Sequence, residues 1–462
     1  MHAKLRLDVG AKIRSIQSNA IIARKPARAE SIQQNPSHSG VTFSGKPHLT
    51  LGGVGRNLAV AIQLLGHKPH FITALVNDRL GTLAINDLDA YGFRKSQLHI
   101  TWLGSGNNNN SVVAAGTGSS GGSGGGSGGG VENDKTRSAN LIESAMTVTS
   151  PTATTPTATC TAPTNDTNTL APATTANDRP TSCFALVLLD SLTGQCEYVI
   201  ANLDTVKAID TNKINENLYR LSTAPIVVLD ANLSRSTIVR LIELCHRYNR
   251  HLFIEPTDVL ALPQLVGALI QIVRQQSSAL SSIVCMTPNL IELKEMVRLF
   301  DTSRDPQQHQ DSNTDGASKV DEARRLAEAL LSKHIPNVRS LVVTLDRDGI
   351  LLAVRSRPGE ANLFNASEFN LLYNIDEATA PNNQSGGIVF QHFPPPQVIE
   401  QPVSGSGAGD SFAAGFISGL LDNEPVGGCV HRGFLASLLA LQDRDTIPMA
   451  LRELANAKVP NE

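Results

Sequence analysis

The glycine-rich segment GSGAGD, at residues 405–410, is the part of the sequence best suited to chemistry, because it runs directly into a helical pattern of small residues. Gly407, Ala408 and Gly409 would let consecutive backbone N–H groups converge at the start of that helix, where the helix dipole also favours an anion. A phosphate group fits such an anion hole. Asp410 follows at once, and its carboxylate can accept a proton from a hydroxyl group during phosphoryl transfer. The alternative is that the small residues only allow close helix packing.

A second glycine cluster, GGVGRN at residues 52–57, also precedes a helical pattern. Neither cluster is a common nucleotide-binding loop. The sequence has no G-x-x-x-x-G-K-[ST] phosphate loop, and it has neither the H-R-D nor the D-F-G motif of protein kinases. GGVGRN also lacks the G-x-G-x-x-G spacing of a dinucleotide site. A kinase with this sequence must therefore be of another type.

The elements that would position these clusters alternate between strands and helices. Continuous apolar runs, typical of buried parallel strands, lie at residues 225–230, 251–256, 281–289 and 340–346. Helical patterns, with apolar residues three and four apart, lie at residues 56–66, 235–248, 289–300, 320–334 and 410–421. This alternation predicts an α/β fold whose sheet is covered by helices on both faces.

A long low-complexity stretch interrupts the pattern between residues 104 and 180. Its Gly, Ser, Thr and Pro residues cannot bury enough apolar surface to offset the entropy lost on ordering, so we predict a disordered insertion. Shorter polar interruptions at residues 302–318 and 381–387 have the same interpretation. The predicted organisation is an N-terminal part of one domain (1–103), the insertion (104–180), and the remainder of the same domain (181–462).

Composition excludes several classes of protein. Thirty-nine basic and 42 acidic residues give a net charge of −3, which is too balanced for a general nucleic-acid binder. No apolar run reaches the length of about 18 residues that a membrane helix needs, and the first ten residues lack the apolar core of a signal peptide. We therefore expect a cytoplasmic protein that binds neither nucleic acid nor membranes. Six well-separated cysteines without a C-x-x-C pair predict reduced thiols, several of them buried.

Four segments, in this order, resemble the PfkB or ribokinase-like family of small-molecule kinases: GGVGRNLA (52–59), MTPNLIEL (286–293), VVTLDRDG (342–349) and SGSGAGDSFAAG (404–415). Arg56 and the runs DANLS (230–234) and FIEPTDV (253–259) are more similar to its pseudouridine kinase branch than to ribokinases or fructokinases. The resemblance spans roughly residues 7–441 without the insertions, and GAGD with its helix is the most specific part. It implies a three-layer α/β/α sandwich with a mostly parallel central sheet and a small β lid.

The resemblance also implies roles on the phosphate side of the site. Asp410 would be the catalytic base, and the backbone of residues 407–409 would stabilise the transferring phosphate. Asn289 and Glu292, spaced as N-x-x-E, would organise magnesium and the ATP phosphates, with Glu292 acting on the metal through water. Thr344 and Gly349 would lie near the nucleotide. A monovalent cation such as K⁺ is a further cofactor to be tested. The alternatives are a helix cap with an exposed glutamate, and an ordinary strand threonine.

On the substrate side, Gly52, Gly53 and Asn57 match the segment that holds the sugar in this family. Glycines permit close backbone approach, and an amide can both donate to and accept from hydroxyl groups. Asp8 resembles the aspartate that binds ribose hydroxyls, and Asn232 aligns with a polar residue that faces the same cleft. The alternatives are that Asn57 caps its own helix, that Asp8 is simply solvated, and that Asn232 stabilises a loop.

Two features depart from the family pattern. Only MHAKLRL precedes Asp8, where the family has an apolar strand and a turn, so a central strand is expected to be missing. Asp346 stands where the family has glycine in T-L-G, which places bulk and negative charge near the expected phosphates.

The leading hypothesis from the sequence is an ATP-dependent kinase for the 5′-hydroxyl of a ribonucleoside, first of all pseudouridine, with a homodimer through the lid left open. Kinases of another sugar or nucleoside are the alternative within catalysis. A catalytically weakened, ligand-binding relative is suggested by the short N-terminus and Asp346. A glycosidase acting on a nucleotide would leave the GAGD anion hole unexplained.

Overall fold

The computed structural model describes residues 19–25, 48–104, 180, 182–190, 196–304, 318–355, 387–424 and 426–455. The chain divides into two compact units, and all of these residues belong to the unit formed by residues 14–35, 42–111 and 180–462. Asp8 and residues 105–179 of the predicted insertion lie outside the described residues.

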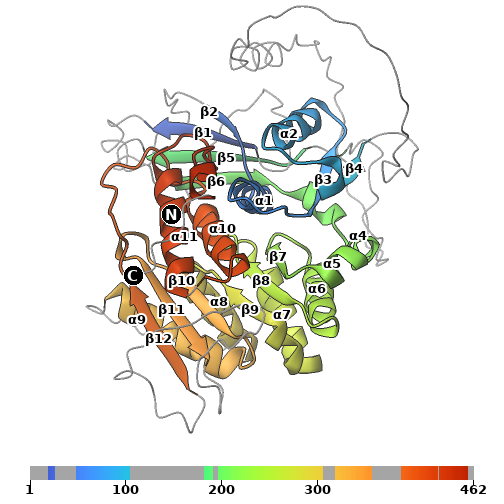
Figure 1. Ribbon diagram of the computed structural model, residues 1–462. Helices are drawn as coiled ribbons and strands as arrows, with labels where there is room; N and C mark the ends of the chain where they lie inside the picture. The colour runs from blue at the N-terminus through green and yellow to red at the C-terminus, as the bar shows by residue number, and fades with distance from the viewer. Residues whose placement is uncertain are drawn as a thin grey trace, which may run out of the picture. The chain divides into compact units, whose positions relative to one another are not determined.

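A six-stranded central sheet has the strand order β12-β11-β10-β9-β8-β7 (Figure 1). Its strands are β7 (Ile226–Asp230), β8 (His251–Glu255), β9 (Ile283–Met286), β10 (Ser340–Thr344), β11 (Ile350–Arg355) and β12 (Ile388–Phe393). Strands β7 to β10 run parallel, and β11 and β12 are antiparallel additions. The four apolar runs in the sequence thus form the parallel strands, as predicted. Because parallel strands share one carboxyl edge, Asp230 of β7 lies directly beside Glu255 of β8.

Helices cover both faces of this sheet, because successive strand residues point to opposite sides. In β8, Leu252 and Ile254 pack into one hydrophobic cluster, whereas Phe253 between them packs into the other. The first cluster includes α6 (Arg235–Arg247), α7 (Leu262–Gln276), α8 (Leu290–Arg304) and α9 (Lys319–Ala329). The second includes α1 (Val54–Leu64), α2 (Arg79–Ala90), α10 (Ala408–Leu421), α11 (Val426–Leu441) and α12 (Leu451–Leu454) (Figure 1). The predicted helix-covered, mostly parallel sheet is therefore confirmed.

Local capping fixes several helix boundaries. The Ser234 hydroxyl accepts a hydrogen bond from the Thr237 N–H at 3.3 Å, so α6 begins at Arg235. Ser318 caps α9 in the same way, through the Asp321 N–H at 3.1 Å. The helix predicted for 320–334 ends differently, because after α9 the chain continues as the π-helical turn η5 (Leu330–His334). The 3₁₀ turns are η2 (Lys95–Gln97), η3 (Asp204–Ala208), η4 (Ser277–Ser282) and η6 (Asp346–Asp348).

A second, four-stranded sheet has the order β2-β1-β5-β6, formed by β1 (Asn19–Lys25), β2 (His48–Leu51), β5 (Phe184–Asp190) and β6 (Cys196–Asn202). Strand β1 runs antiparallel to β2 and parallel to β5. Ala185 of β5 and Ala201 of β6 line the same cavity as residues of α1 and β7. This sheet therefore corresponds to the small β lid that the family resemblance implies.

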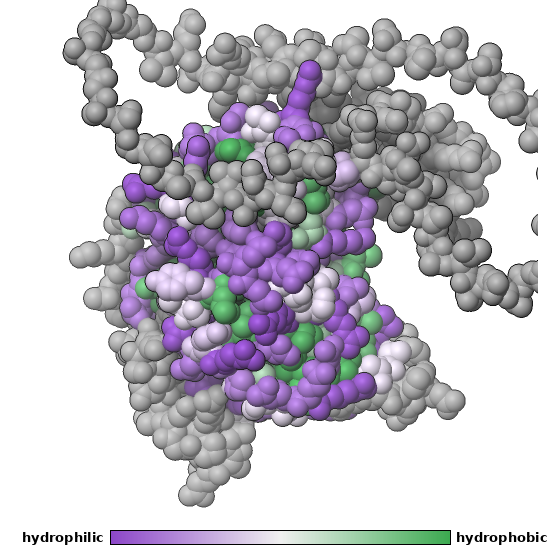
Figure 2. Space-filling model, turned by 90° about the vertical axis from the view of Figure 1, so that its right-hand side faces the viewer, coloured by the Kyte–Doolittle hydropathy of each residue, from purple (hydrophilic) through white to green (hydrophobic). Residues whose placement is uncertain are grey.

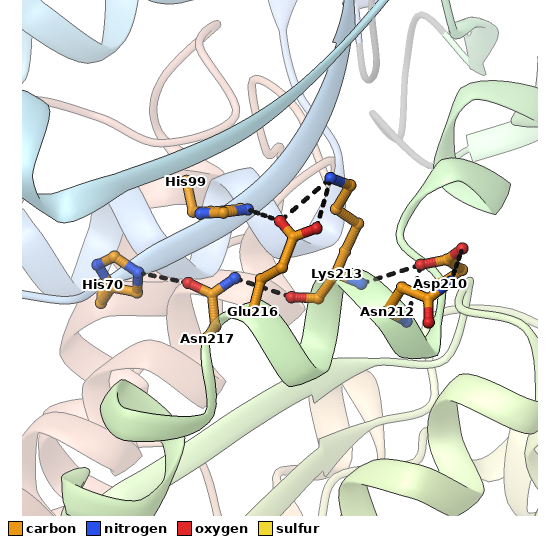
Figure 3. Close-up of polar contacts among 7 residues, drawn as sticks. All are labelled: His70, His99, Asp210, Asn212, Lys213, Glu216 and Asn217. Atoms are coloured by element: carbon orange, nitrogen blue, oxygen red, sulfur yellow. Dashed lines mark hydrogen bonds and ion pairs between the residues drawn. The ribbon is translucent and has the colours of Figure 1, made fainter. Parts of the chain in front are cut away.

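Strands β3 (Phe71–Val76) and β4 (Leu98–Leu103) form a separate parallel pair, joined through α2. Among the described strands, β7 is an edge strand of the central sheet, at the opposite end of the strand order from β12. Side chains near the β3–β4 pair contact α4 (Thr211–Glu216) and its junction with α5 (Leu218–Thr223) (Figure 3). His99 Nε2 lies 3.4 Å from a Glu216 carboxylate oxygen, and His70 Nε2 lies 3.2 Å from the Asn217 amide oxygen.

The ends of the predicted insertion lie next to each other. A Cβ atom built on Gly104 would lie 3.2 Å from Cγ of Pro180, so a very short linker could join these two residues.

Hydrophilic residues dominate the visible surface (Figure 2), and four of the cysteines lie in the interior. Figure 2 shows a face that is mainly hydrophilic, with hydrophobic residues only in small groups. Cys183, Cys245, Cys285 and Cys429 are buried free thiols, as expected for those four. None of the described helices combines the length and the hydrophobicity that a membrane crossing needs.

Candidate active site

A cavity of about 790 Å³ lies at the carboxyl edge of β7 and beside the starts of α1 and α10. Five residues singled out in the sequence line it together: Gly52, Gly53, Asn57, Asn232 and Asp410. They come from segments far apart in the sequence: Asn57 and Asp410, which contact each other, are separated by 353 positions. The structure thus gathers the described residues of the predicted substrate side around the predicted base.

The GSGAGD turn contains the start of α10. Gly407 is the N-cap of α10 and adopts a left-handed backbone with φ 83°. A Cβ atom at this position would lie 2.1 Å from the Thr446 carbonyl oxygen, so only glycine fits. A Cβ atom on Gly409 would meet nothing within 4 Å. Because first-turn N–H groups of a helix have no intrahelical acceptor, the open space at Gly409 can receive an anion.

Close helix packing uses other glycines of the same helix. A Cβ atom on Gly415 would lie 2.6 Å from the Arg432 carbonyl oxygen, and one on Gly419 would lie 2.8 Å from Cα of Cys429. Both contacts are with α11. The packing alternative therefore explains Gly415 and Gly419, but it does not explain Gly409, which faces open space.

Asp410 is the third residue of α10, and its side chain faces the cavity. Its carboxylate accepts a hydrogen bond of 2.7 Å from the Asn57 amide nitrogen. Removal from water raises the pKa of Asp410 to about 6, and the nearby charge of Asp230 adds to this effect, whereas Asn57 and Arg56 oppose it. The group is thus a carboxylate at neutral pH, with a proton affinity higher than that of an ordinary aspartate. This is the property that a general base needs.

Asn57 lies inside α1, where its side chain is only 4% exposed. The N-cap of that helix is Gly53, with φ 96°, so the alternative that Asn57 caps its own helix is wrong. The Asn57 amide oxygen accepts from Arg56 at 3.1 Å and from the Thr446 hydroxyl at 3.3 Å. Its amide nitrogen is therefore the atom that faces Asp410.

Asp230 connects β7 to the glycine cluster of α1. A Cβ atom on Gly55 would lie 2.6 Å from a carboxylate oxygen of Asp230, so a larger residue here would displace the Asp230 side chain. The Asn232 N–H donates to Asp230 at 3.0 Å, and Asn232 also lines the cavity, so its loop-stabilising role and its predicted place at the cleft are both observed. Burial raises the pKa of Asp230 above its usual range.

Two buried glutamates extend the acidic edge. Glu255, at the end of β8, accepts a short hydrogen bond from the Thr287 hydroxyl. Burial is the main cause that raises its pKa, and the charges of Glu292 and Asp410 raise it further. Burial likewise raises the pKa of Glu292 to about 7, with Asp258 and Asp410 contributing. The carboxyl edge of the sheet therefore gathers acidic groups that hold their protons more tightly than usual, and a nearby cation would favour their ionised forms.

Asn289 and Glu292 form a reciprocal cap at the start of α8. The Asn289 N–H donates to Glu292 at 2.9 Å, and the Glu292 N–H donates to Asn289 at 2.8 Å. These two residues therefore form a helix cap, as the alternative interpretation expected. That interpretation also expected an exposed glutamate, which is wrong because Glu292 is only 4% exposed. Thr344 lies beside Asn289 through an isolated parallel bridge at the end of β10.

Gly349 has a structural requirement of its own. Its φ is 85°, and a Cβ atom would lie 2.1 Å from the Phe393 carbonyl oxygen. The turn between η6 and β11 therefore needs glycine here, whether or not a nucleotide binds nearby. Asp346, three residues earlier, also has a positive φ of 55°, and its carboxylate lies 3.6 Å from Nζ of Lys319.

Several residues of the site were not assigned a role from the sequence. Asp87 pairs with Arg56, Thr446 contacts Asn57, and Glu255 and Asp230 lie at adjacent strand ends. A signal existed for the two acids, because each ends an apolar strand in the runs DANLS and FIEPTDV. Asp87 and Thr446 stand in no motif, so only the fold reveals them.

Comparison with known families fits this geometry. Residues 386–452 match the model described as "pfkB family carbohydrate kinase". This segment contains Gly407, Gly409, Asp410 and Thr446. Over this segment the chain is therefore similar to the pfkB family. The match indicates that the protein is a phosphotransferase. No curated protein sequence matches the chain significantly.

Solved structures show the same fold at low sequence identity. Ribokinase from Thermotoga maritima has a TM-score of 0.51 at 15% identity, covering 96% of this chain and 97% of the other. Ribokinase from Giardia lamblia has a TM-score of 0.54 at 12% identity, covering 95% and 97%. Adenosine kinase from Sinorhizobium meliloti has a TM-score of 0.52 at 13% identity, covering 96% and 90%. The fold is thus ribokinase-like, as the resemblance implied.

Proposed function

We propose that the protein is an ATP-dependent kinase that phosphorylates the 5′-hydroxyl of a ribonucleoside, with pseudouridine as the first candidate. The observation that carries the proposal is Asp410, a carboxylate whose pKa is raised to about 6, placed in the first turn of α10 and facing the cavity. A base and an anion-binding helix start thus lie within one turn of each other. Phosphoryl transfer to a hydroxyl group needs both.

In this mechanism, the substrate hydroxyl donates its proton to Asp410 as its oxygen bonds to the γ-phosphorus of ATP, the bond from that phosphorus to the β,γ-bridging oxygen breaks, and ADP leaves. The transferring phosphoryl group accepts hydrogen bonds from the N–H groups at residues 407–409, which stabilise its charge. Asn57 keeps Asp410 in place through their 2.7 Å hydrogen bond. Asn289 and Thr344, which lie side by side, and Gly349 are proposed for the nucleotide side.

Magnesium would neutralise charge on the phosphate oxygens. Among the described residues, no three His, Cys, Asp or Glu side chains are grouped closely enough to bind a metal by themselves. Magnesium commonly keeps several waters and needs only one or two carboxylates, with phosphates supplying other ligands. The buried carboxyl groups of Glu292 and Glu255 would fit that role through water, because a nearby cation would favour the ionised forms that burial disfavours.

The lining of the cavity supports a nucleoside as the substrate class. One part is polar, with Asp230, Asn232 and Asp258, which suits ribose hydroxyls. Another part is apolar, with Phe71, Ile72 and Ile226, which suits the face of a base. Two alternatives remain. Another nucleoside or sugar would use the same base and helix start, and a catalytically weakened, ligand-binding relative is favoured by Asp346.

A substrate screen tests this proposal. The purified chain is incubated with magnesium, radiolabelled ATP and single nucleosides or sugars, and label transfer is measured beside the Asp410→Asn variant. We expect label on a ribonucleoside, pseudouridine first, and almost none with the variant. Calorimetric binding of nucleoside without any transfer would support the ligand-binding relative instead. Equal transfer by parent and variant would refute the role of Asp410.

A further inference from the structure

A chain of polar contacts leads from α2 to the catalytic base. The Asp87 carboxylate lies 2.6 Å from Nη2 of Arg56, and these side chains are only 20% and 10% exposed. Arg56 Nη1 donates to the Asn57 amide oxygen at 3.1 Å. The Asn57 amide nitrogen donates to Asp410 at 2.7 Å. Asp87 itself does not line the cavity, whereas the other three residues do.

The guanidinium group of Arg56 is held from two sides. Asp87 binds one terminal nitrogen, and the ring of Tyr91 lies 5.1 Å from the guanidinium carbon. Both partners belong to α2 or the residue after it. Because the guanidinium is planar and its donors have fixed directions, holding one nitrogen on Asp87 directs the other toward Asn57.

This arrangement fixes the orientation of the Asn57 amide. Its oxygen accepts hydrogen bonds from Arg56 and from Thr446. If the amide were reversed, its NH₂ group would face the Arg56 guanidinium, which can only donate, and its oxygen would face the Asp410 carboxylate. Both contacts would be unfavourable. The donors on the oxygen side therefore keep the NH₂ group directed at Asp410.

We propose that Asp87 is a positioning residue for catalysis, which holds Arg56 so that the Asn57 amide keeps Asp410 oriented and ionised. The inference rests on the proposed kinase function for its catalytic consequence. The charged groups that face these residues are Asp445, near Asp87 and Tyr91, and Asp230, Glu255 and Glu292, near Asp410. The charge of Asp230 raises the pKa of Asp410, and the charge of Arg56 lowers it. If Arg56 is displaced, its lowering effect weakens, and the pKa of Asp410 rises.

The test compares Asp87→Asn with Asp89→Asn, a matched control on an exposed position of the same helix. We expect Asp87→Asn to lower kcat about tenfold, through misplacement of the base, with little change in the KM for ATP. We also expect the acid limb of its pH–rate profile to move to higher pH. Asp89→Asn should match the parent, and Asp87→Glu, which keeps the carboxylate, should recover part of the loss.

A measurement without turnover separates this inference from the kinase proposal. NMR titration of the Asp410 carboxyl carbon, assigned by its absence in Asp410→Asn, should show a higher pKa in Asp87→Asn than in the parent. If the parent phosphorylates no substrate but this shift is seen, the kinase proposal fails and the positioning role stands. If Asp87→Asn loses stability but keeps the parental pKa, kcat and pH profile, Asp87 is only structural and the inference is wrong.

Discussion

Replacing Gly407 by alanine should destabilise the protein and disrupt the site together. The backbone there has φ 83°, which costs a non-glycine residue about 1 kcal/mol. The added methyl carbon would lie 2.1 Å from the Thr446 carbonyl oxygen, and relief of such a contact typically costs about 1–3 kcal/mol. The sum is about 2–4 kcal/mol, or a fall in Tm of about 3–7 °C for a domain of this size.

The same substitution should also lower activity, because Thr446 cannot move without consequences. Its hydroxyl lies 3.0 Å from the Leu51 carbonyl oxygen and 3.3 Å from the Asn57 amide oxygen, and its one proton is shared between these two acceptors. A displaced Thr446 would therefore disturb the residue that holds Asp410.

Gly409→Ala is the matched comparison, since its methyl group would meet nothing within 4 Å. It lies in the first turn of α10, where alanine is favoured over glycine, so the Tm should stay level or rise. The methyl group would nevertheless enter the proposed phosphate space, and the KM for ATP should rise.

Thermal unfolding followed by circular dichroism, with phosphoryl transfer assays on the same samples, checks both substitutions. A Gly407→Ala protein with the parental Tm would refute the left-handed turn packed against Thr446. A Gly409→Ala protein with the parental KM for ATP would place the phosphate elsewhere.

Three further predictions follow from other parts of the fold. Asp346→Gly should lower the KM for ATP and leave stability level or higher, because it removes a carboxylate and relieves a φ of 55°; steady-state kinetics giving an equal or higher KM would show that Asp346 does not oppose the nucleotide. Replacing residues 105–179 by a short Gly/Ser linker should preserve activity and Tm, because Gly104 and Pro180 lie next to each other in space. A large drop in Tm at equal ligand concentration would show that the segment packs against the rest of the protein. Burial lowers the pKa of His70 below 6.5, so the unfolded chain binds a proton more readily than the folded protein, and stability is lost as pH falls below that value. His70→Gln should lessen the loss of stability between about pH 7 and pH 5, measured by urea titration. An unchanged loss of stability would contradict this.

The parallel part of the central sheet could be predicted from the sequence because its strands are buried on both faces. Residues 225–230, 251–256 and 340–346 are continuous apolar runs, and each contains the observed strand. Strand β12 has no such run. Among its residues only Val389 is buried, and the strand is defined by antiparallel pairing with β11. Such pairing depends on distant partners that a local pattern cannot reveal.

The candidate site shows the same division. Gly407, Gly409 and Asp410 could be found because they stand together in one short motif, which combines glycines at a helix start with a carboxylate. The orientation of that chemistry comes from residues far away in sequence. Asn57 contacts Thr446 at a separation of 389 residues, and Arg56 contacts Asp87 at a separation of 31. Neither Thr446 nor Asp87 stands in a recognisable motif, so their roles depend on the folded chain.

The most direct test of the account is the pH dependence of phosphoryl transfer by the parent and by Asp410→Asn. With a pKa of about 6, the Asp410 base is ionised at pH 7.5 and protonated in acid, so the parental kcat/KM should fall below about pH 6. Asparagine keeps the shape but cannot accept a proton, so kcat should fall about a hundredfold to ten-thousandfold. Nucleoside binding and folding should persist. A folded Asp410→Asn protein that binds nucleoside and turns over at the parental rate would contradict the mechanism.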